Sequence, residues 1–132
     1  MSRIVHFEIP ADDPERAIKF YEKVFDWQIE KWDGPIEYWL IMTGEEDKPG
    51  IDGGLARRED PTTGVGNTID VKNLDASLAN VKAHGGKVIR PRIAVPGVGW
   101  MAYIKDTEGN VFGLYGKRFL SCLNRNFLSA GI

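Results

Sequence analysis

The pattern of apolar and polar positions occurs twice along the chain, in a similar order each time. Residues 4–9 are predicted to form a strand, because β-branched and aromatic side chains alternate there in part with polar ones. Asp13 followed by Pro14 is typical of a helix start, since an aspartate caps the first turn and a proline suits it. Apolar residues then recur at helical spacing and predict one buried stripe. That stripe is Ala17, Phe20, Tyr21, Val24 and Phe25.

Short strands separated by turns follow the first helix, and the whole pattern then restarts. A segment rich in proline, threonine and glycine at 60–64 is the best internal linker. Beyond it, Asn73 caps a second helix, and the glycines after His84 end that helix. The expected strands are 27–30, 37–42, 51–57, 67–71, 87–90, 100–104 and 111–115, with a connection at 91–99.

The order of these elements is β-α-β-β-β, repeated once. Ile9 corresponds to Ile69, and Ala17 to Ser77, at the same offset of 60 residues. The sequence therefore predicts an α+β fold of two tandem βαβββ modules, 1–59 and 65–116, joined by the linker 60–64. The tail 117–132 carries apolar residues at helix-like spacing. Packing on the sheet, packing on a partner subunit and a frayed end all stay open for it.

Composition narrows the class of protein. The chain has 132 residues, the size of one domain, and its net charge of −2 lacks the basic excess of a nucleic-acid-binding protein. No apolar run approaches the roughly 20 residues that a membrane span needs. A single cysteine cannot form an internal disulfide, so nothing indicates export. We expect a soluble, cytoplasmic protein that binds neither nucleic acid nor membrane.

Four segments, in their order and spacing, resemble a known family. They are residues 6–25, residues 71–75, residues 85–88 and residues 106–115. Together they resemble the vicinal oxygen chelate superfamily, which contains glyoxalase I, bleomycin-resistance proteins, fosfomycin-resistance enzymes and extradiol dioxygenases; the glyoxalase-related branch is most similar. The resemblance implies paired βαβββ modules whose sheets close around a cleft for a small molecule. It also implies a homodimer.

Metal-using members of that superfamily hold a divalent ion with four side chains. The resemblance places these ligands at His6, Gly54, Gly66 and Gly113, so three of the four positions lack a side chain. A divalent ion needs three or more protein ligands to be held against water. The resemblance therefore implies a degenerate metal site and no cofactor. Asp52 and Asp70 are the nearest carboxylates that could substitute, although neither is at a family position. Gly54 and Gly113 would leave room for a flat organic ligand against the backbone.

His6 and Glu8 are the candidate catalytic pair. Alternate residues of a strand share a face, so the two side chains are expected on one side of the sheet. Imidazole titrates near neutral pH, and a nearby carboxylate orients it for acid–base work. A structural reading stays open for each residue. His6 is then a partly buried strand histidine, and Glu8 a solvated carboxylate.

Five further residues are candidate ligand contacts, because small-molecule pockets combine aromatic walls with a few polar groups. They are Trp39, Thr68, Asp70, Trp100 and Tyr115. Packing in the core or at a dimer interface is the alternative for the tryptophans. Alternation puts Trp39 with Ile41 and leaves Tyr38 on the opposite face, but it does not say which face points inward.

The favoured function is metal-independent binding of a small molecule. The alternative is a glyoxalase-like lyase or isomerase that uses His6 and Glu8 as acid–base groups. A metal-dependent dioxygenase is weaker, since its two histidines and one carboxylate are missing.

Overall fold

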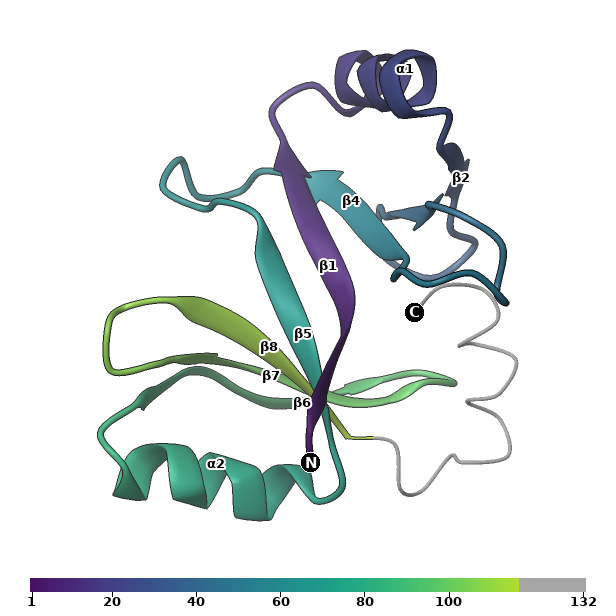
Figure 1. The fold of residues 1–132 in the computed structure, drawn as a ribbon. Coiled ribbons are helices and arrows are strands. Elements are labelled where there is room, and N and C mark those ends of the chain that lie inside the picture. Colours follow the sequence, from purple (N-terminus) through teal and green to yellow (C-terminus); the bar gives the residue numbers. More distant parts are fainter. Residues whose placement is uncertain (117–132) are drawn as a thin grey trace. The chain divides into compact units, whose positions relative to one another are not determined.

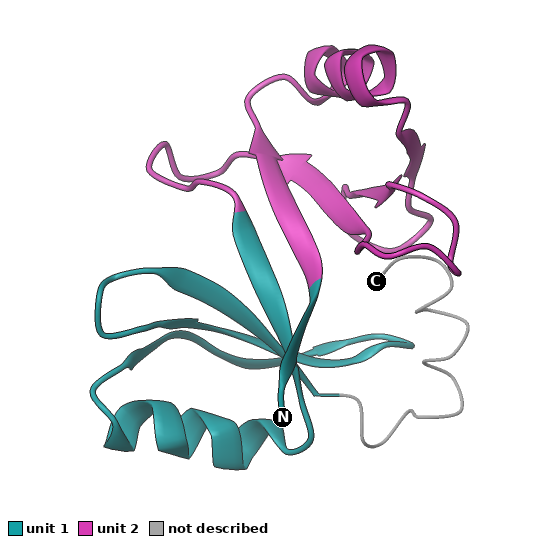
Figure 2. Ribbon diagram, viewed as in Figure 1, with its two compact units in different colours: residues 1–5, 66–129 teal, residues 6–65, 130–132 magenta. Residues whose placement is uncertain are grey.

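The computed structural model describes residues 1–116, in which ten elements follow one another as two βαβββ rounds (Figure 1). The tail 117–132 and its three open alternatives lie outside the described residues. The chain divides into two compact units (Figure 2). Unit 1 combines residues 1–5 with the second round, and unit 2 is formed by residues 6–65. The predicted α+β class and repeated module are confirmed.

Unit 2 is a mixed four-stranded sheet with one helix. Its strands lie in the order β2-β3-β4-β1, and β1 runs parallel to β4 from Phe7 to Ala11. The other two pairings are antiparallel. The elements are β1 (Arg3–Ala11, of which residues 6–11 belong to this unit), α1 (Pro14–Phe25), β2 (Gln28–Lys31), β3 (Trp39–Met42) and β4 (Gly53–Arg57).

Local sequence sets both ends of α1. The Asp13 carboxylate accepts a hydrogen bond from the backbone N–H of Arg16, as expected for a helix cap. The helix ends at Asp26, which adopts the left-handed conformation and donates its N–H to the carbonyl of Glu22. Below the helix, the core of unit 2 is Ile9, Ala11, Ile41 and Leu55.

Only part of the predicted α1 stripe is buried. Ala17 and Tyr21 pack against the core of unit 2. Phe20, Val24 and Phe25 remain 55%, 54% and 53% exposed. The expectation of one buried stripe is therefore wrong for these three residues, which leave an exposed apolar surface on α1.

Unit 1 repeats the arrangement in the order β5-β8-β7-β6, with β5 and β8 parallel. Asn73 caps α2 by accepting from the N–H of Ala76, and α2 contacts β6, β7 and β8. The core beneath it is Val71, Leu74, Ala102, Ile104 and Leu114. The elements are β5 (Gly66–Val71), α2 (Leu74–Ala83), β6 (Lys87–Val95), β7 (Gly99–Lys105) and β8 (Val111–Gly116).

The largest extension beyond a predicted strand is in β6. β6 continues through the expected connection as far as Val95. Its pairing with β7 shifts register between Val88 and Arg90 and again between Arg90 and Ile93. Pro91 lies at the second shift, where its missing N–H interrupts no regular ladder bond. Within residues 1–116, neither helix is long and apolar enough to cross a membrane.

Candidate functional site

A buried hydrogen-bonded pair lies on the face of the unit 2 sheet opposite to α1. Phe7 and Ile9 of β1 point toward the helix side, so His6 points away from it. The Nε2 atom of His6 is 2.7 Å from the Tyr38 phenol oxygen. His6 is 9% exposed and Tyr38 is 8% exposed, so the bond is shielded from water. The two rings lie end to end and nearly coplanar, with their centroids 6.4 Å apart and an angle of 21° between their planes.

Neighbouring groups fix the position of Tyr38. The backbone N–H of Trp32 donates to the Tyr38 carbonyl at 2.8 Å. The Trp32 ring meets the Tyr38 ring edge-on, with centroids 6.2 Å apart. Tyr38 comes immediately before β3, whose antiparallel pairing with β4 sets Leu40 opposite Gly54. The phenol is therefore held over β4 from both the backbone and the ring.

The Tyr38 phenol leaves space only for a glycine at position 54. A Cβ atom added at Gly54 would overlap the phenol oxygen and the Cζ atom of Tyr38. No side chain fits at position 54 while Tyr38 occupies that space. The expectation that Gly54 leaves room for a flat organic ligand is therefore wrong, because Tyr38 fills the room.

The corresponding glycine of unit 1, Gly113, is also covered. A Cβ atom there would lie 3.0 Å from the Thr68 hydroxyl oxygen and 3.4 Å from carbon atoms of Met101 and Tyr103. Thr68 is the register partner of Gly113, on the adjacent strand. Gly54 and Gly113, two of the three glycines at family ligand positions, thus lie under hydroxyl-bearing side chains, whereas a Cβ atom at Gly66 would meet only the backbone oxygen of Val111 at 3.8 Å.

The residues present do not fit a divalent metal ion. Of the four positions that the resemblance assigns, only His6 carries a ligand side chain, and its Nε2 atom is bonded to Tyr38. Asp52, a possible substitute, accepts the backbone N–H of Thr43 at 2.9 Å. Among residues 1–116, no group of three or more histidine, cysteine or acidic side chains is placed to hold an ion.

Glu8 lies two residues after His6 on the same face and is partly exposed. Its role with His6 as an acid–base group stays a prediction. Tyr38, the bonded partner of the His6 Nε2 atom, was not among the site residues expected from the sequence. The alternation of residues 38–42 contained the signal, since it separates Tyr38 from Trp39.

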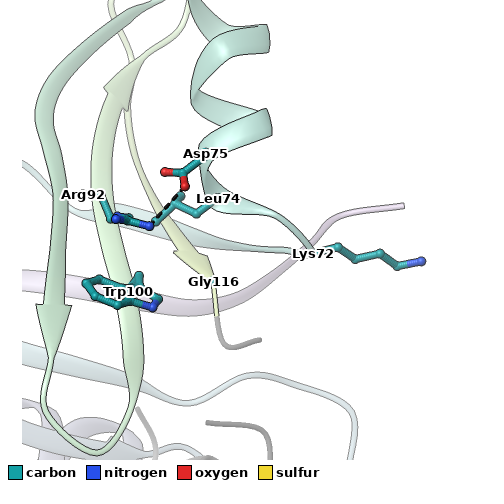
Figure 3. Close-up of a pocket in the computed structure, with 6 residues that line it drawn as sticks. All are labelled: Lys72, Leu74, Asp75, Arg92, Trp100 and Gly116. Atoms are coloured by element: carbon teal, nitrogen blue, oxygen red, sulfur yellow. Dashed lines mark hydrogen bonds and ion pairs between the residues drawn. The ribbon is translucent and has the colours of Figure 1, made fainter. Parts of the chain in front are cut away.

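The two candidate tryptophans lie on the helix sides of their sheets. Trp39 packs against the core beneath α1, and Trp100 packs against the core beneath α2. Trp100 also lines a small pocket in unit 1 (Figure 3). There the Arg92 guanidinium lies 4.4 Å from the Trp100 ring centroid and is paired with Asp75 at 3.1 Å. Ligand contact by either tryptophan stays a prediction.

The other three candidates share the opposite face of the unit 1 sheet. Thr68 and Asp70 are two residues apart on β5 and so share a face. Tyr115 of β8 is the register partner of Asp70 and lies on the same face. Tyr115 is 4% exposed and donates its phenol hydrogen to the carbonyl of Val98 at 3.0 Å. Burial, assisted by the negative charge of Asp70, raises the pKa of Tyr115 to about 12. Thr68 is 3% exposed, and its hydroxyl has no hydrogen-bond partner among the described residues.

Two βαβββ modules with polar groups on the faces away from their helices define a class of paired-module α+β proteins. Residues 3–114 match the model of the Glyoxalase/Bleomycin resistance protein/Dioxygenase superfamily. The chain belongs to this superfamily, which confirms the resemblance noted from its motifs. A glyoxylase-like domain-containing protein of Didymella fabae is 32% identical over 117 residues, covering 85% of this chain and 91% of the relative.

Solved structures agree on the fold. The hypothetical protein BH1468 of Bacillus halodurans C-125 matches with a TM-score of 0.67 and 15% identity, covering 88% of this chain and 94% of that one. Methylmalonyl-CoA epimerase of Mycobacterium tuberculosis matches with a TM-score of 0.64 and 16% identity, covering 86% and 87%. At such low identities these likenesses show the fold alone.

Proposed function

We propose that this chain is a metal-independent member of the superfamily that binds a small molecule. The observation that carries the proposal is the bond between His6 and Tyr38, 2.7 Å long and buried. Tyr38 covers position 54, where the family places a metal ligand, and occupies the Nε2 atom of the one histidine at a ligand position. An ion would have to displace this pair and would gain one imidazole, which is too few ligands to hold it.

Metal content tests this proposal directly. Full-length protein, purified without tag or chelator, is analysed for metals and then titrated with Zn²⁺, Mn²⁺ or Ni²⁺ alone while thermal unfolding is followed. We expect substoichiometric metal, and the same small shift for wild type and for His6→Ala. His84 is exposed, so His84→Ala is the matched control. One ion per chain, lost in His6→Ala and kept in His84→Ala, would overturn the proposal.

A second candidate is a glyoxalase-like lyase or isomerase that moves a proton with His6 and Glu8. The buried contact between His6 and Tyr38 favours it, because a phenol hydrogen-bonded to an imidazole orients the ring for proton transfer. Since one structural neighbour is named a methylmalonyl-CoA epimerase, methylmalonyl-CoA is a reasonable first probe. Deuterium exchange into this probe, lost in His6→Ala and kept in His84→Ala, would support catalysis. The absence of exchange at high enzyme concentration would count against this substrate.

The proposal includes a homodimer in the cytoplasm. The exposed apolar surface of α1 supports self-association, because contiguous exposed apolar side chains mark interaction sites. A single cysteine suits a reducing compartment. Light scattering of the purified chain and fractionation of cells measure these two properties.

A further inference from the structure

The exposed apolar surface of α1 is continuous. Phe20 and Val24 are one turn apart on the helix, and the rings of Phe20 and Phe25 meet edge to face with their centroids 6.4 Å apart. All three side chains are more than half exposed. Large apolar side chains on a surface are usually scattered, and a continuous group of them marks an interaction surface. The surface runs along a helix that is about 18 Å long at the usual rise per residue.

The sequence of the tail 117–132 has a complementary pattern. Four large apolar side chains recur there at the spacing of one helix face, and both arginines of the tail fall on the opposite side. As a helix, the tail would be about 24 Å long, which is enough to cover α1. A helix of this length is marginal in water by itself, because most helical stability in proteins comes from packing of the apolar face. The four apolar side chains are Phe119, Leu120, Leu123 and Phe127.

Charge favours the tail over a second α1 as the partner of this surface. Residues 6–65 contain fifteen acidic and seven basic side chains, whereas residues 117–132 contain three basic side chains and no acidic one. Opposite net charges speed the encounter of two segments. In contrast, two copies of α1 in contact would bring together the exposed Arg16, Lys19 and Lys23 of both copies, and like charges across an interface are unfavourable.

From these observations we infer that the tail of one copy packs on the exposed apolar surface of α1 in a second copy. The apolar face of the tail covers Phe20 and Val24, and the exchange of two tails gives two equal contacts in a closed dimer. This inference rests on the proposed homodimer and names the segments that join its copies. The tail lies beyond residues 3–114, the part of the chain that matches the superfamily, so the contact is a feature of this chain rather than of the superfamily.

Cross-linking of single-cysteine chains tests the contact. Cys122 is the only cysteine of the chain and lies in the tail. Full-length wild type is mixed with full-length Val24→Cys/Cys122→Ser, so that one chain carries its thiol in the tail and the other carries it on α1. The mixture exchanges subunits and is then treated with a short bis-maleimide. We expect several times more product of two linked chains from the mixture than from either chain alone.

Glu15 provides a matched control on the same helix. It is exposed and lies nine residues before Val24, which places it on the opposite side of α1. The chain Glu15→Cys/Cys122→Ser, mixed with wild type in the same way, should give little linked product. The difference between positions 24 and 15 therefore reports which side of α1 the tail approaches.

Two substitutions in the tail test its apolar face. Leu123→Lys places a charge on that face, and Ser121→Lys places the same charge on the other side of the tail. Leu123→Lys should weaken the dimer about tenfold or more, because burying an unpaired charge is unfavourable. Ser121→Lys should leave the dimer unchanged. Light scattering over a dilution series measures the dimer, and circular dichroism checks that both variants are folded.

Four results would overturn the inference and leave the homodimer standing. In the first, Val24→Cys/Cys122→Ser links to itself as well as to wild type, so that α1 meets α1. In the second, position 15 gives as much product as position 24. In the third, Val24→Cys, which keeps Cys122, is linked within single chains, so that the tail covers its own α1. In the fourth, Leu123→Lys is as dimeric as Ser121→Lys. A monomeric wild type would remove the homodimer together with the inference, and light scattering of wild type alone identifies that case.

Discussion

The phenol oxygen of Tyr38 lies 2.7 Å from the Nε2 atom of His6 and covers the Cα atom of Gly54, so that residue 54 has no space for a side chain. Tyr38 thus binds the Nε2 atom of His6 and also fills the space over Gly54, the neighbouring ligand position. Because Tyr38 contacts both residues, substitution of Tyr38 should change the effect of a side chain at position 54 and the NMR signals of His6.

Gly54→Ala should therefore be costly only while Tyr38 is present. The new methyl group forces the phenol away from His6, and overpacking of this kind costs about 1–3 kcal/mol of unfolding free energy. In a Tyr38→Ala background the methyl group has space, so the added cost of Gly54→Ala should be close to zero. Urea unfolding of the four variants in this double-mutant cycle measures the coupling.

Gly44 offers a matched control for that cycle. A Cβ atom at Gly44 would meet nothing within 4 Å, so Gly44→Ala should change the unfolding free energy by less than about 0.5 kcal/mol. If Gly54→Ala proves as mild as Gly44→Ala, or equally costly with and without Tyr38, the steric account of position 54 fails.

Tyr38→Phe tests the hydrogen bond while keeping the ring. The buried imidazole loses the partner of its Nε2 atom, which should cost about 1–3 kcal/mol of unfolding free energy. The ring nitrogen signals of His6 in ¹⁵N NMR should shift, because the bond that orients the imidazole is lost. Those of His84, which is bonded through Nδ1 to the Asn80 carbonyl at 2.9 Å, should not move. Unchanged His6 signals would show that the phenol does not set the state of the imidazole.

The repeat of the modules was predictable because its signals are local. Asp13 and Asn73 cap their helices through contacts three residues away, and such contacts can be read from a short window of sequence. The alternation along 38–42 likewise separated Tyr38 from Trp39. It did not assign the faces, because both sets are apolar and a two-residue period looks the same from either side.

The partner of His6 and the state of Gly54 were not predictable for a different reason. Tyr38 lies 32 residues from His6 in the chain, and the two meet because β3 pairs with β4 and β4 with β1. A glycine at a ligand position has no signal of its own that distinguishes empty space from space filled by a distant side chain. Only the tertiary structure shows that Tyr38 lies over it.

Alkaline pH should destabilise the fold through Tyr115. The pKa of this phenol is raised from 10.0 to about 12, so the folded chain keeps the proton at pH values where the unfolded chain has lost it. The resulting stabilisation is complete below pH 10 and is lost as the pH rises from 10 toward 12. Urea midpoints between pH 9 and 11.5 should therefore fall more steeply for wild type than for Tyr115→Phe.

Because the chain has four tyrosines, the difference in absorbance at 295 nm between wild type and Tyr115→Phe locates the titration of the Tyr115 phenol. Because burial is the larger cause of the shift and Asp70 the smaller one, Asp70→Asn should lower the pKa of Tyr115 only in part. Parallel stability curves for wild type and Tyr115→Phe, or a Tyr115 phenol that ionises near pH 10, would contradict this account.

Self-association should depend on the exposed apolar surface of α1, where Phe20, Val24 and Phe25 are each more than half exposed. A lysine at position 24 places a charge in the middle of this surface, and burying that charge at an interface is unfavourable. Light scattering should give twice the chain mass for wild type and a shift toward the monomer for Val24→Lys. Ala79→Lys adds the same charge at an exposed position of α2 and should remain dimeric. A monomeric wild type, or a Val24→Lys variant as dimeric as Ala79→Lys, would remove α1 from the interface.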